Sequence, residues 1–282
     1  MADVTSDRTS PPDNGSDFRS ALKHSVRLSS RRTQRLATIL DVLAQRATLD
    51  VHELARLTGV SEATLRRDLD FLEHQELLHR THGGASSRTA AAELPVRYRD
   101  GHQREAKQRI ARACADLVSR RSQAVAISGG STTTEVARLL ADRRELTIVT
   151  NAINIAMELS SKPNLRIIVA GGQLRSQTSE VVGAWTERFL EGLNFNVTIM
   201  GVDGVSARGG LTTHDAVEAR SNRKMVDRSQ KVIVVADSTK IGHLTLSQIA
   251  EVGRGQLLIT DSAASPDEIA ALRARGMEVV LV

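Results

Sequence analysis

Seven short apolar runs rich in β-branched residues recur through the C-terminal two thirds of the chain, with helical patterns between them. The runs occupy residues 124–128, 146–150, 166–170, 197–202, 231–236, 256–260 and 278–282. Apolar strands that alternate with helices are typical of a parallel sheet covered by helices on both faces. We therefore predict an α/β domain of Rossmann-like layout over 103–282, which opens with a helix over Gln103–Val118.

The predicted domain lacks the sequence signatures of common cofactor sites. No G-x-G-x-x-G run followed by an acidic residue opens it, so we expect no dinucleotide site. The one cysteine, Cys114, cannot form an intrachain disulfide, and no Cys/His cluster has the spacing of a zinc site. We therefore expect no cofactor and no metal, and we interpret Cys114 as a core residue.

Polar residues and glycines follow several of the predicted strands. The segments concerned are 128–134, 150–151, 171–172, 201–204, 209–213 and 236–240. Parallel strands end at one edge of their sheet, where ligands bind in open α/β domains. A segment such as Thr150-Asn151 is equally typical of an ordinary helix cap. The convergence of six segments on one edge favours a binding site.

The first of these segments, SGGSTTT over Ser128–Thr134, lies directly between a strand and a helix. Glycines let the backbone approach a ligand closely, although glycines and hydroxyls also make ordinary caps. The N–H groups and hydroxyls at a helix N-terminus suit a phosphate group. We therefore predict that this loop binds the phosphate of a ligand.

The stretch GVSEATLRRDL over Gly59–Leu69 predicts the turn and second helix of a helix-turn-helix. Its glycine tolerates the positive φ of a tight turn, and the serine two residues later is a good N-cap. Leu65, Leu69 and Leu72 recur at i, i+4 and i+7 and form one apolar stripe toward the core of the domain.

The polar side of this helix is left for DNA. Ala63, Arg67 and Asp70 point away from the leucine stripe, and Thr64 and Arg66 flank them. The first residues of a recognition helix meet base edges in the major groove, where arginine pairs with guanine. The alternative is an amphipathic surface helix whose Arg-Arg-Asp run is a solvated group of charges.

The preceding segment favours the DNA-binding interpretation. A capping box at Asp50 opens a short helix that runs into the glycine turn and has Val51, Leu54, Ala55 and Leu57 on its apolar side. A helix that ends at a glycine turn before a second helix is the helix-turn-helix connection.

The outer segments complete a small domain over 29–87. A helix over 32–46 carries apolar residues at helical spacing, namely Leu36, Ile39, Leu40 and Leu43. After the recognition helix, LLHRTHGG over 77–84 is typical of one arm of a β-wing. The sequence therefore predicts a winged helix-turn-helix.

Charge alone does not indicate a nucleic-acid partner. The 282 residues carry a formal net charge of +5, but residues 29–88 hold nine Lys/Arg against eight Asp/Glu. A few arginines placed on one face would have to supply the contacts to DNA phosphates. Aromatic residues make up 2% of the chain, which excludes a single-strand-binding platform of stacked rings.

The length suits two domains joined by a linker over 88–102. Residues 1–28, rich in Ser, Thr, Asp and Pro, predict a disordered tail. The first residues have no apolar h-region, and no apolar run approaches the ~20 residues of a membrane span. We therefore expect a cytoplasmic protein with no membrane partner.

Residues 31–86 resemble the N-terminal winged helix-turn-helix of the DeoR family of bacterial transcriptional regulators, through VSEATLRRDL and RTHGGA at the expected spacing. Gln75-Glu76 replaces a glycine that the family usually has before the wing. Later motifs stand in the order of the family's C-terminal sensor domain, whose fold is similar to that of ribose-5-phosphate isomerases. These motifs are ISGGSTTTEVARLL, IVTNAINIA, VAGGQLR, VGAWTERFL, GVDGVSARGGLTT, VADSTKIG and LLITD.

Two sets of functional residues follow from the motifs and the resemblance together. The predicted DNA contacts are Ser61, Ala63, Thr64, Arg66, Arg67, Arg80 and His82. The predicted effector contacts are Gly130, Ser131, Thr132, Thr133, Thr150, Asn151, Asp203, Gly204 and Lys240. Ser128 stands where many relatives have an aspartate, and Lys107 matches a family lysine that we interpret more simply as solvated.

The resemblance implies a DNA-binding transcriptional regulator, namely a repressor of a sugar-catabolic operon. A phosphorylated sugar would release it from double-stranded operator DNA, through which it would associate with the nucleoid. We expect a homodimer or homotetramer whose recognition helices lie about one DNA turn, ~34 Å, or a multiple of it apart.

The competing hypothesis is a phosphosugar isomerase with a DNA-binding appendage. Proton abstraction needs a general base, for which His214, Asp215 and Glu218 are candidates. Their helix continues as EARSNRKMVDR and resembles a charged surface helix, so we predict no enzymatic activity. The clustered polar strand ends disfavour a third alternative, a pure oligomerisation module without a ligand.

Overall fold

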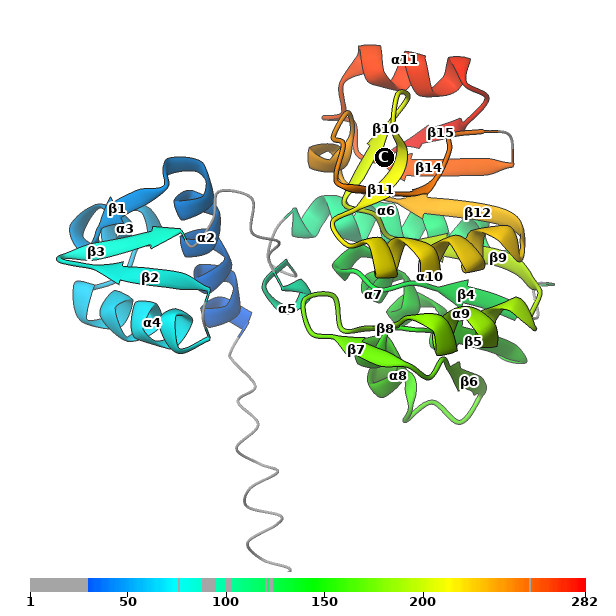
Figure 1. Ribbon diagram of the computed structural model, residues 1–282, viewed down its shortest axis with the longest axis horizontal. Helices are drawn as coiled ribbons and strands as arrows, with labels where there is room; N and C mark the ends of the chain where they lie inside the picture. Colours follow the sequence, from blue (N-terminus) through cyan, green and yellow to red (C-terminus); the bar gives the residue numbers. More distant parts are fainter. Residues whose placement is uncertain are drawn as a thin grey trace, which may run out of the picture.

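The computed structural model describes residues 30–75, 77–87, 95–99, 103–119, 121, 124–253 and 255–282. They form a small N-terminal domain and a larger α/β domain, with the short helix α5 (Val96–Arg99) between them (Figure 1). The predicted tail 1–28 lies outside the described residues, as does most of the predicted linker 88–102. The exact domain boundaries stay a prediction.

The N-terminal domain is a three-helix core with a small antiparallel sheet. Its elements are α2 (Ser30–Arg46), β1 (Thr48–Asp50), α3 (Val51–Thr58), α4 (Glu62–His74), β2 (Leu78–Thr81) and β3 (Gly84–Ser87), and its sheet has the order β1-β3-β2. The predicted stripe of Leu65, Leu69 and Leu72 has no exposed surface, and it packs with the leucines of α2. The winged helix-turn-helix is confirmed.

Local signals explain where these helices begin and end. The Asp50 carboxylate accepts a hydrogen bond from the backbone N–H of Glu53 at 2.7 Å, as the predicted cap requires. Gly59 has φ 68° and closes α3 in the left-handed conformation. Gln75 closes α4 at φ −85°, so this chain needs no glycine there. Leu57 is 40% exposed, and its assignment to the apolar side of α3 was wrong.

The wing depends on two adjacent glycines. Gly83 turns the chain between β2 and β3 at φ 92°, which an L side chain rarely adopts. A Cβ on Gly84 would lie 2.1 Å from the carbonyl oxygen of Leu49, so β3 can approach β1 only through a glycine. Gly83 and Gly84 of the RTHGGA motif are therefore each required, for two different steric reasons.

All seven predicted strands form one parallel sheet in the C-terminal domain. In spatial order they are β15 (Glu278–Leu281), β14 (Gln256–Thr260), β12 (Ser229–Val235), β9 (Phe195–Met200), β4 (Ala124–Ile127), β5 (Leu146–Thr150) and β6 (Leu165–Val169). The chain passes from β4 to β6 in one direction and then returns to place β9 against the other side of β4. This reversal is the topological switch point of a Rossmann-like sheet.

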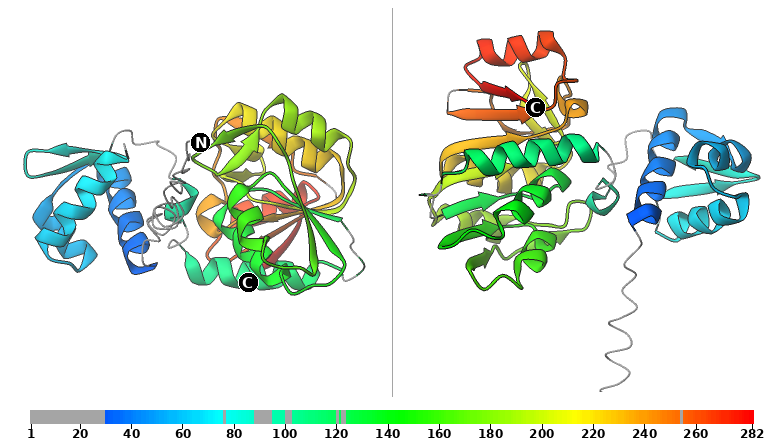
Figure 2. Two further views of the ribbon diagram at one scale, coloured as in Figure 1. Left: turned by 90° about the horizontal axis from the view of Figure 1, so that it is seen from below. Right: turned by 180° about the vertical axis from the view of Figure 1, so that it is seen from behind.

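Helices cover both faces of the sheet, as predicted, and each face has its own apolar core (Figure 2). One face carries α6 (Arg104–Leu117), α7 (Ser131–Leu140) and α8 (Ile153–Leu159), and the other carries α9 (Ala184–Glu191), α10 (Ala216–Asp227) and α11 (Pro266–Ala274). Cys114 lies in the first core, where burial raises the pKa of its thiol to about 12. No described helix is long and apolar enough to cross a bilayer.

Short antiparallel elements that the sequence patterns did not predict surround the sheet. They are the hairpin β7 (Gln173–Arg175) and β8 (Glu180–Val182), the small sheet of β10 (Gly204–Ser206), β11 (Gly210–Thr213) and β13 (Ser247–Ala250), and the 3₁₀ turn η1 (Ser238–Lys240). Runs of three or four residues are too short for a periodicity to stand out. They matter because they complete the walls of the site.

Candidate effector pocket and DNA-binding face

A cavity of about 410 Å³ opens where β4, β9 and β12 end, at the switch point of the sheet. Six of the nine predicted effector contacts line it, namely Gly130, Ser131, Thr132, Thr133, Asp203 and Lys240. The predicted convergence of strand ends therefore produces a real concavity.

One end of the cavity suits an anion. Gly130 has φ 132° and leads into α7, whose first-turn N–H groups at Ser131 and Thr132 have no partner within the helix. The hydroxyls of Thr133 and Thr134 donate to the carbonyl oxygen of Gly130 at 2.9 and 2.7 Å. Neither hydroxyl caps the free N–H groups of α7, which therefore remain for a ligand together with the side chains of Ser131 and Thr132.

Three cationic side chains surround that end. Lys240 reaches the cavity from η1, Arg99 from α5 and Lys107 from α6. Lys107 is only 4% exposed, and its Nζ donates to the carbonyl oxygen of Arg99 at 2.6 Å. Our interpretation of Lys107 as a solvated lysine was therefore wrong, because helical spacing alone does not show what covers a side chain.

Asp203 is the acidic residue nearest these cations. Arg99 Nη1 lies 2.9 Å from its Oδ1, and Thr213 Oγ1 lies 2.9 Å from its Oδ2. Burial alone would raise the pKa of Asp203, but the charges of Arg99, His214 and Lys240 outweigh it. The net effect, to which the Thr213 hydroxyl also contributes, is a pKa below the ordinary value, and Asp203 is held ionised.

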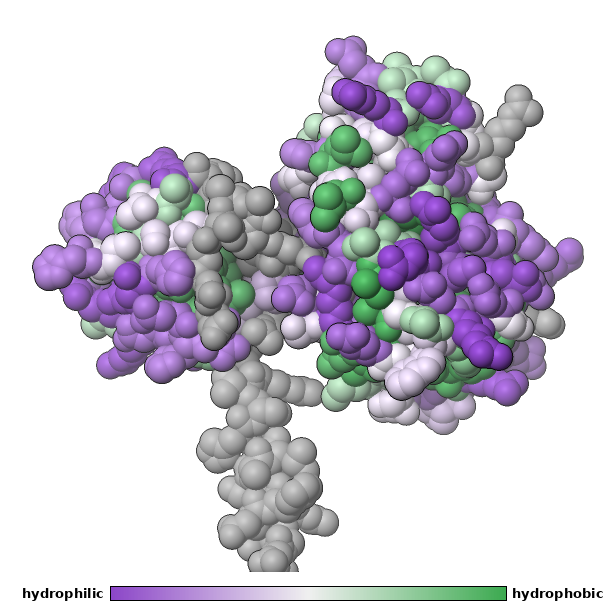
Figure 3. Space-filling view, in the orientation of Figure 1, coloured by the Kyte–Doolittle hydropathy of each residue, from purple (hydrophilic) through white to green (hydrophobic). Residues whose placement is uncertain are grey.

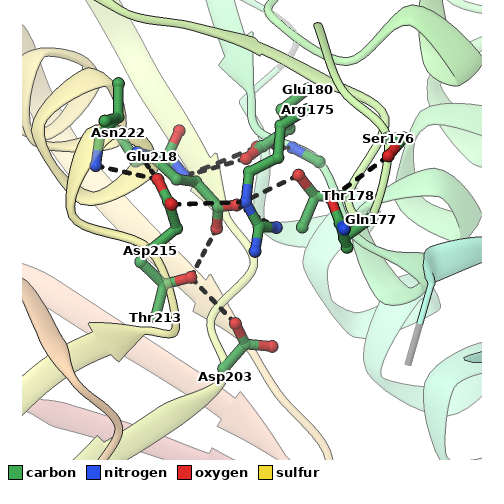
Figure 4. A network of polar contacts seen from close by, with 12 residues as sticks. Arg175, Ser176, Gln177, Thr178, Glu180, Asp203, Thr213, Asp215, Glu218 and Asn222 are labelled. Carbon is green, nitrogen blue, oxygen red and sulfur yellow. Dashed lines mark hydrogen bonds and ion pairs between the residues drawn. The ribbon is translucent and has the colours of Figure 1, made fainter. Parts of the chain in front are cut away.

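A second part of the lining, which we call the acidic wall, carries two carboxyl groups that are not among the predicted effector contacts (Figure 4). Glu218 of α10 accepts hydrogen bonds at Oε2 from Arg175 and Thr178, each at 3.1 Å, and Glu218 is 4% exposed. The expectation of a charged surface helix was therefore wrong for this face of α10. The sequence analysis named Glu218 only as a candidate base of the competing isomerase hypothesis, and no motif indicated that it contacts an effector.

Glu180 of β8 is the second carboxyl group and is 1% exposed. Burial and the negative charges of Glu218 and Asp203 raise its pKa well above the ordinary value. The backbone N–H of Gly129 and the amide of Asn222 donate to it, which lowers the pKa only in part. Glu180 therefore keeps its proton to a higher pH than an ordinary glutamate does.

Thr213 lies between two of these acids. Its Oγ1 lies 2.9 Å from Oδ2 of Asp203 and 2.5 Å from Oε1 of Glu218. A hydroxyl has one hydrogen, so Thr213 donates to one of the two carboxylates at a time.

Three predicted effector contacts do not reach the cavity wall. Thr150 Oγ1 donates to Ile127 and accepts from the backbone of Ala152, so it joins β4 to β5. Asn151 is fully buried, donates to Asn222, and has no partner for its Oδ1 within the described part of the chain. Gly204 begins β10, where a Cβ would lie 2.5 Å from a backbone carbonyl oxygen of the loop before β13.

The serine that replaces the common aspartate also lies behind the wall. Ser128 has no exposed surface, and its Oγ accepts a hydrogen bond from the backbone N–H of Gly201 at 3.0 Å. It therefore ties the end of β4 to the end of β9. Of the other candidates, His214 lines the cavity and Asp215 caps the start of α10. Within the described residues, no group of His, Cys, Asp or Glu is arranged to hold a metal ion.

The recognition helix presents most of the predicted DNA contacts to solvent. Ser61, Ala63, Arg66 and Arg67 are exposed and Thr64 is half-buried on α4, on a domain whose surface in Figure 3 is mostly hydrophilic. Arg66 also pairs with Glu62 on the same helix, with an Nη2 to Oε2 distance of 3.1 Å.

The charge run on α4 is not simply solvated. Asp68 is 2% exposed and accepts hydrogen bonds from Arg32 and Arg35 of α2 at 2.9 and 2.6 Å. The solvated-run alternative is therefore wrong for this residue. Asp68 holds α4 against the core, and Arg66 and Arg67 remain on the exposed face of the helix.

The two wing residues differ from each other. Arg80 is half-buried, lies 3.4 Å from a carboxylate oxygen of Asp70, and donates its backbone N–H to Glu73. It fastens the wing to α4. His82 is exposed in the turn between β2 and β3. Their contacts to DNA stay predictions.

Comparison with known proteins agrees with this architecture. Residues 35–91 match the family model described as a DeoR-like helix-turn-helix domain, and residues 102–262 match the DeoR C terminal sensor domain. The glycerol-3-phosphate regulon repressor of Escherichia coli K12 is 33% identical over 232 residues, which covers 82% of this chain and 92% of that protein. The transcriptional regulator GlpR of Haloferax volcanii is 34% identical over 249 residues, covering 88% and 96%.

Among solved structures, ribose-5-phosphate isomerase A of Neisseria gonorrhoeae covers 51% of this chain and 54% of its own, at 15% identity and a TM-score of 0.35. Nothing about activity rests on so distant a likeness. Two family models match in the expected order, and the relatives align over almost their whole length. These two findings establish the family. The chain therefore belongs to the DeoR family of DNA-binding transcriptional regulators.

Proposed function

We propose that this regulator is a repressor that leaves its operator when a phosphorylated sugar or polyol fills the cavity. The observation that carries the proposal is the polarity of the cavity. Its lining offers the N-terminus of α7 and three cationic side chains for an anion, and the carboxyl groups of Glu180 and Glu218 for hydroxyl groups. A ligand with a phosphate at one end and hydroxyl groups at the other matches both.

The phosphate is expected at the α7 end. A helix N-terminus and nearby ammonium groups favour an anion, and Ser131 and Thr132 add hydroxyls at 8% and 7% exposure. Lys240 supplies a positive charge from the next strand end.

The hydroxyl groups are expected at the acidic wall. The raised pKa of Glu180 favours a carboxyl group that donates a hydrogen bond, and Glu218 accepts bonds from Thr178 and can accept one from a ligand hydroxyl. Donor and acceptor carboxyl groups side by side suit a polyol, whose hydroxyls both donate and accept.

The DNA-binding part of the proposal rests on α4. Exposed Arg67 and Ala63 stand at the start of the helix, where base contacts are made in the major groove. The relatives reported above include a named repressor, which supports repression as the sign of control. A homodimer or homotetramer formed through the sensor domain would present two such helices to a repeated operator.

The experiment that tests this is a titration of DNA from the gene's own upstream region, followed by fluorescence anisotropy. It is repeated with ribose 5-phosphate, fructose 6-phosphate, glycerol 3-phosphate and the matching unphosphorylated compounds. We expect specific binding that one phosphorylated compound abolishes and its unphosphorylated partner does not. Specific binding that no compound alters would refute the ligand assignment, and absence of specific binding would refute the regulator.

An isomerase remains the second candidate because Glu218 and His214 do line the cavity. Glu218, however, already accepts hydrogen bonds from Arg175 and Thr178, which makes it a weaker base. We propose that the cavity binds without catalysis. Turnover of ribose 5-phosphate or fructose 6-phosphate by the purified chain would contradict this.

A further inference from the structure

The short helix α5 belongs to both domains at once (Figure 1). Tyr98 is 1% exposed, packs in the apolar core of the N-terminal domain, and brings α5 against α2. Val96 and Arg99 of the same helix belong to the wall of the cavity. Four consecutive residues therefore join the core behind the recognition helix to the ligand site.

Three polar contacts attach α5 to the sensor domain. The backbone N–H of Val96 donates to the carbonyl oxygen of Gln177 at 2.7 Å. Lys107 Nζ donates to the carbonyl oxygen of Arg99 at 2.6 Å, and the Arg99 guanidinium pairs with Asp203 at 2.9 Å. Four of these five residues line the cavity, so whatever fills the cavity meets the attachments of α5.

A phosphate in this cavity competes directly for Arg99. A phosphate group carries more negative charge than the Asp203 carboxylate, and guanidinium groups bind it in a bidentate manner. Arg99 and the α7 loop line the same cavity of about 410 Å³. When the guanidinium turns toward a ligand, its bond to Asp203 is lost and α5 loses one of its three attachments.

We propose that α5 couples the cavity to the DNA-binding domain: an anionic ligand draws Arg99 away from Asp203, α5 shifts, and Tyr98 carries the shift into the core behind α4. The inference rests on the proposed function for the class of ligand. It gives Tyr98 and Arg99 a regulatory role, although the sequence analysis predicted only a linker over residues 88–102. The ligand contacts Arg99 when the Arg99–Asp203 pair is broken and not when the pair is intact. A ligand that binds two arrangements with different affinity shifts the equilibrium between them.

The first test needs no ligand and uses the full chain. Arg99→Gln and Asp203→Asn each remove the ion pair, so amide hydrogen exchange in α2 over Leu36–Leu43 should accelerate by roughly fivefold or more. The double variant should exceed neither single variant by much, because both changes remove one contact. Arg220→Gln is the control, since it removes the same charge from a solvent-exposed pair with Glu187. Unchanged exchange in α2 in both single variants would overturn the proposal.

The second test measures operator affinity with and without ligand. The probes are fructose 6-phosphate, glucosamine 6-phosphate, ribose 5-phosphate, glycerol 3-phosphate and inorganic phosphate, each at a concentration that calorimetry shows to be saturating for the variant in use. Saturation with the ligand should weaken operator binding by the unmodified protein about tenfold or more. It should weaken operator binding by Arg99→Lys to a smaller degree. In Arg99→Gln the change should stay under about threefold.

The outcomes separate the two proposals. A saturated Arg99→Gln protein that loses operator affinity as the unmodified protein does would overturn coupling through α5. If the unmodified protein binds none of the probes, the proposed function fails, and the exchange experiment still decides the role of α5.

Discussion

Nε of Arg35 on α2 lies 2.6 Å from Oδ2 of Asp68 on the recognition helix, and Asp68 is almost completely buried. Arg32 reaches the other carboxylate oxygen at 2.9 Å and also stacks on the ring of Phe71 at 4.9 Å. The orientation of α4 is thus fixed by an ion pair at its middle as well as by its leucines.

Replacement of Asp68 should destabilise the N-terminal domain. Asp68→Asn keeps the shape but leaves two arginines without their shared carboxylate, and we expect a loss of about 2 kcal/mol. Calorimetric unfolding of the full chain measures it in the transition of the smaller domain. Asp70→Asn is the control, because Asp70 is exposed and its pair with Arg80 is worth less than about 1 kcal/mol. Equal losses in the two variants would contradict the assignment.

Arg67→Ala should weaken operator binding by about 1–3 kcal/mol if Arg67 makes a bidentate base contact. Arg66→Ala should cost the same only if Arg66 leaves Glu62, so we expect the smaller effect there. Anisotropy titrations at fixed salt measure both. Arg112→Ala, at an exposed position of α6, is the matched control. Full affinity in both α4 variants would refute the recognition surface.

Lys240→Ala should weaken binding of the phosphorylated ligand by about tenfold, the effect of losing one charge contact of about 1.4 kcal/mol. Thr132→Val should act in the same direction by removing a hydroxyl from the anion end. Calorimetry measures both, and higher ligand concentrations should be needed to release DNA. Lys224→Ala serves as control, since Lys224 pairs with Glu191 on the surface. Ligand binding as tight as in the unmodified protein would exclude these two residues from the pocket.

Glu180→Gln should change how stability depends on pH. Burial and the neighbouring carboxylates raise the pKa of Glu180 well above its ordinary value of 4.5, so the folded protein keeps this proton longer than the unfolded chain. The stability that the proton contributes is complete below about pH 4.5 and is lost as pH rises toward the folded pKa, by about 1.4 kcal/mol per pH unit. Glutamine cannot ionise, so the variant should gain relative stability as pH rises.

Thermal unfolding at pH 4.5, 6 and 8 provides the measurement. The difference in Tm between Glu180→Gln and the unmodified protein should grow in favour of the variant with increasing pH. Glu251→Gln, at an exposed glutamate, should show a constant difference. A constant difference for Glu180→Gln as well would show that its carboxyl group ionises normally.

The sheet could be predicted from sequence because buried parallel strands are continuous apolar runs, as KVIVVA at β12 illustrates. The place of the glycine-hydroxyl loop on the cavity wall could be predicted because parallel strands end at one edge of their sheet; its binding of an anion stays a prediction. The acidic wall could not, since Glu180 lies on a three-residue strand and Glu218 in a helix rich in charges. Segments that are distant in the sequence bury these two side chains, and the spacing of residues within one element gives no information about such segments.

The same limit explains the individual errors. Thr150 and Asn151 stand at a strand end, but β5 is one strand away from the switch point. Thr150 therefore joins β4 to β5, and Asn151 contacts Asn222 of α10 behind the cavity wall. Lys107 and Asp68 lie on amphipathic helices whose polar sides are covered by α5 and α2. A helical pattern predicts which side is apolar and leaves open whether the other side meets water.

The walls of the cavity come from parts of the chain with different places in the fold. The loops after β4 and β12 leave strands of the central sheet, which lies between two apolar cores. The hairpin β7–β8, which carries Thr178 and Glu180, lies between β6 and α9 in the chain and, among the described residues, pairs with no strand of that sheet. Under the proposed function, a changed hairpin sequence would alter the specificity for the hydroxyl groups of a ligand without removing a strand from the sheet.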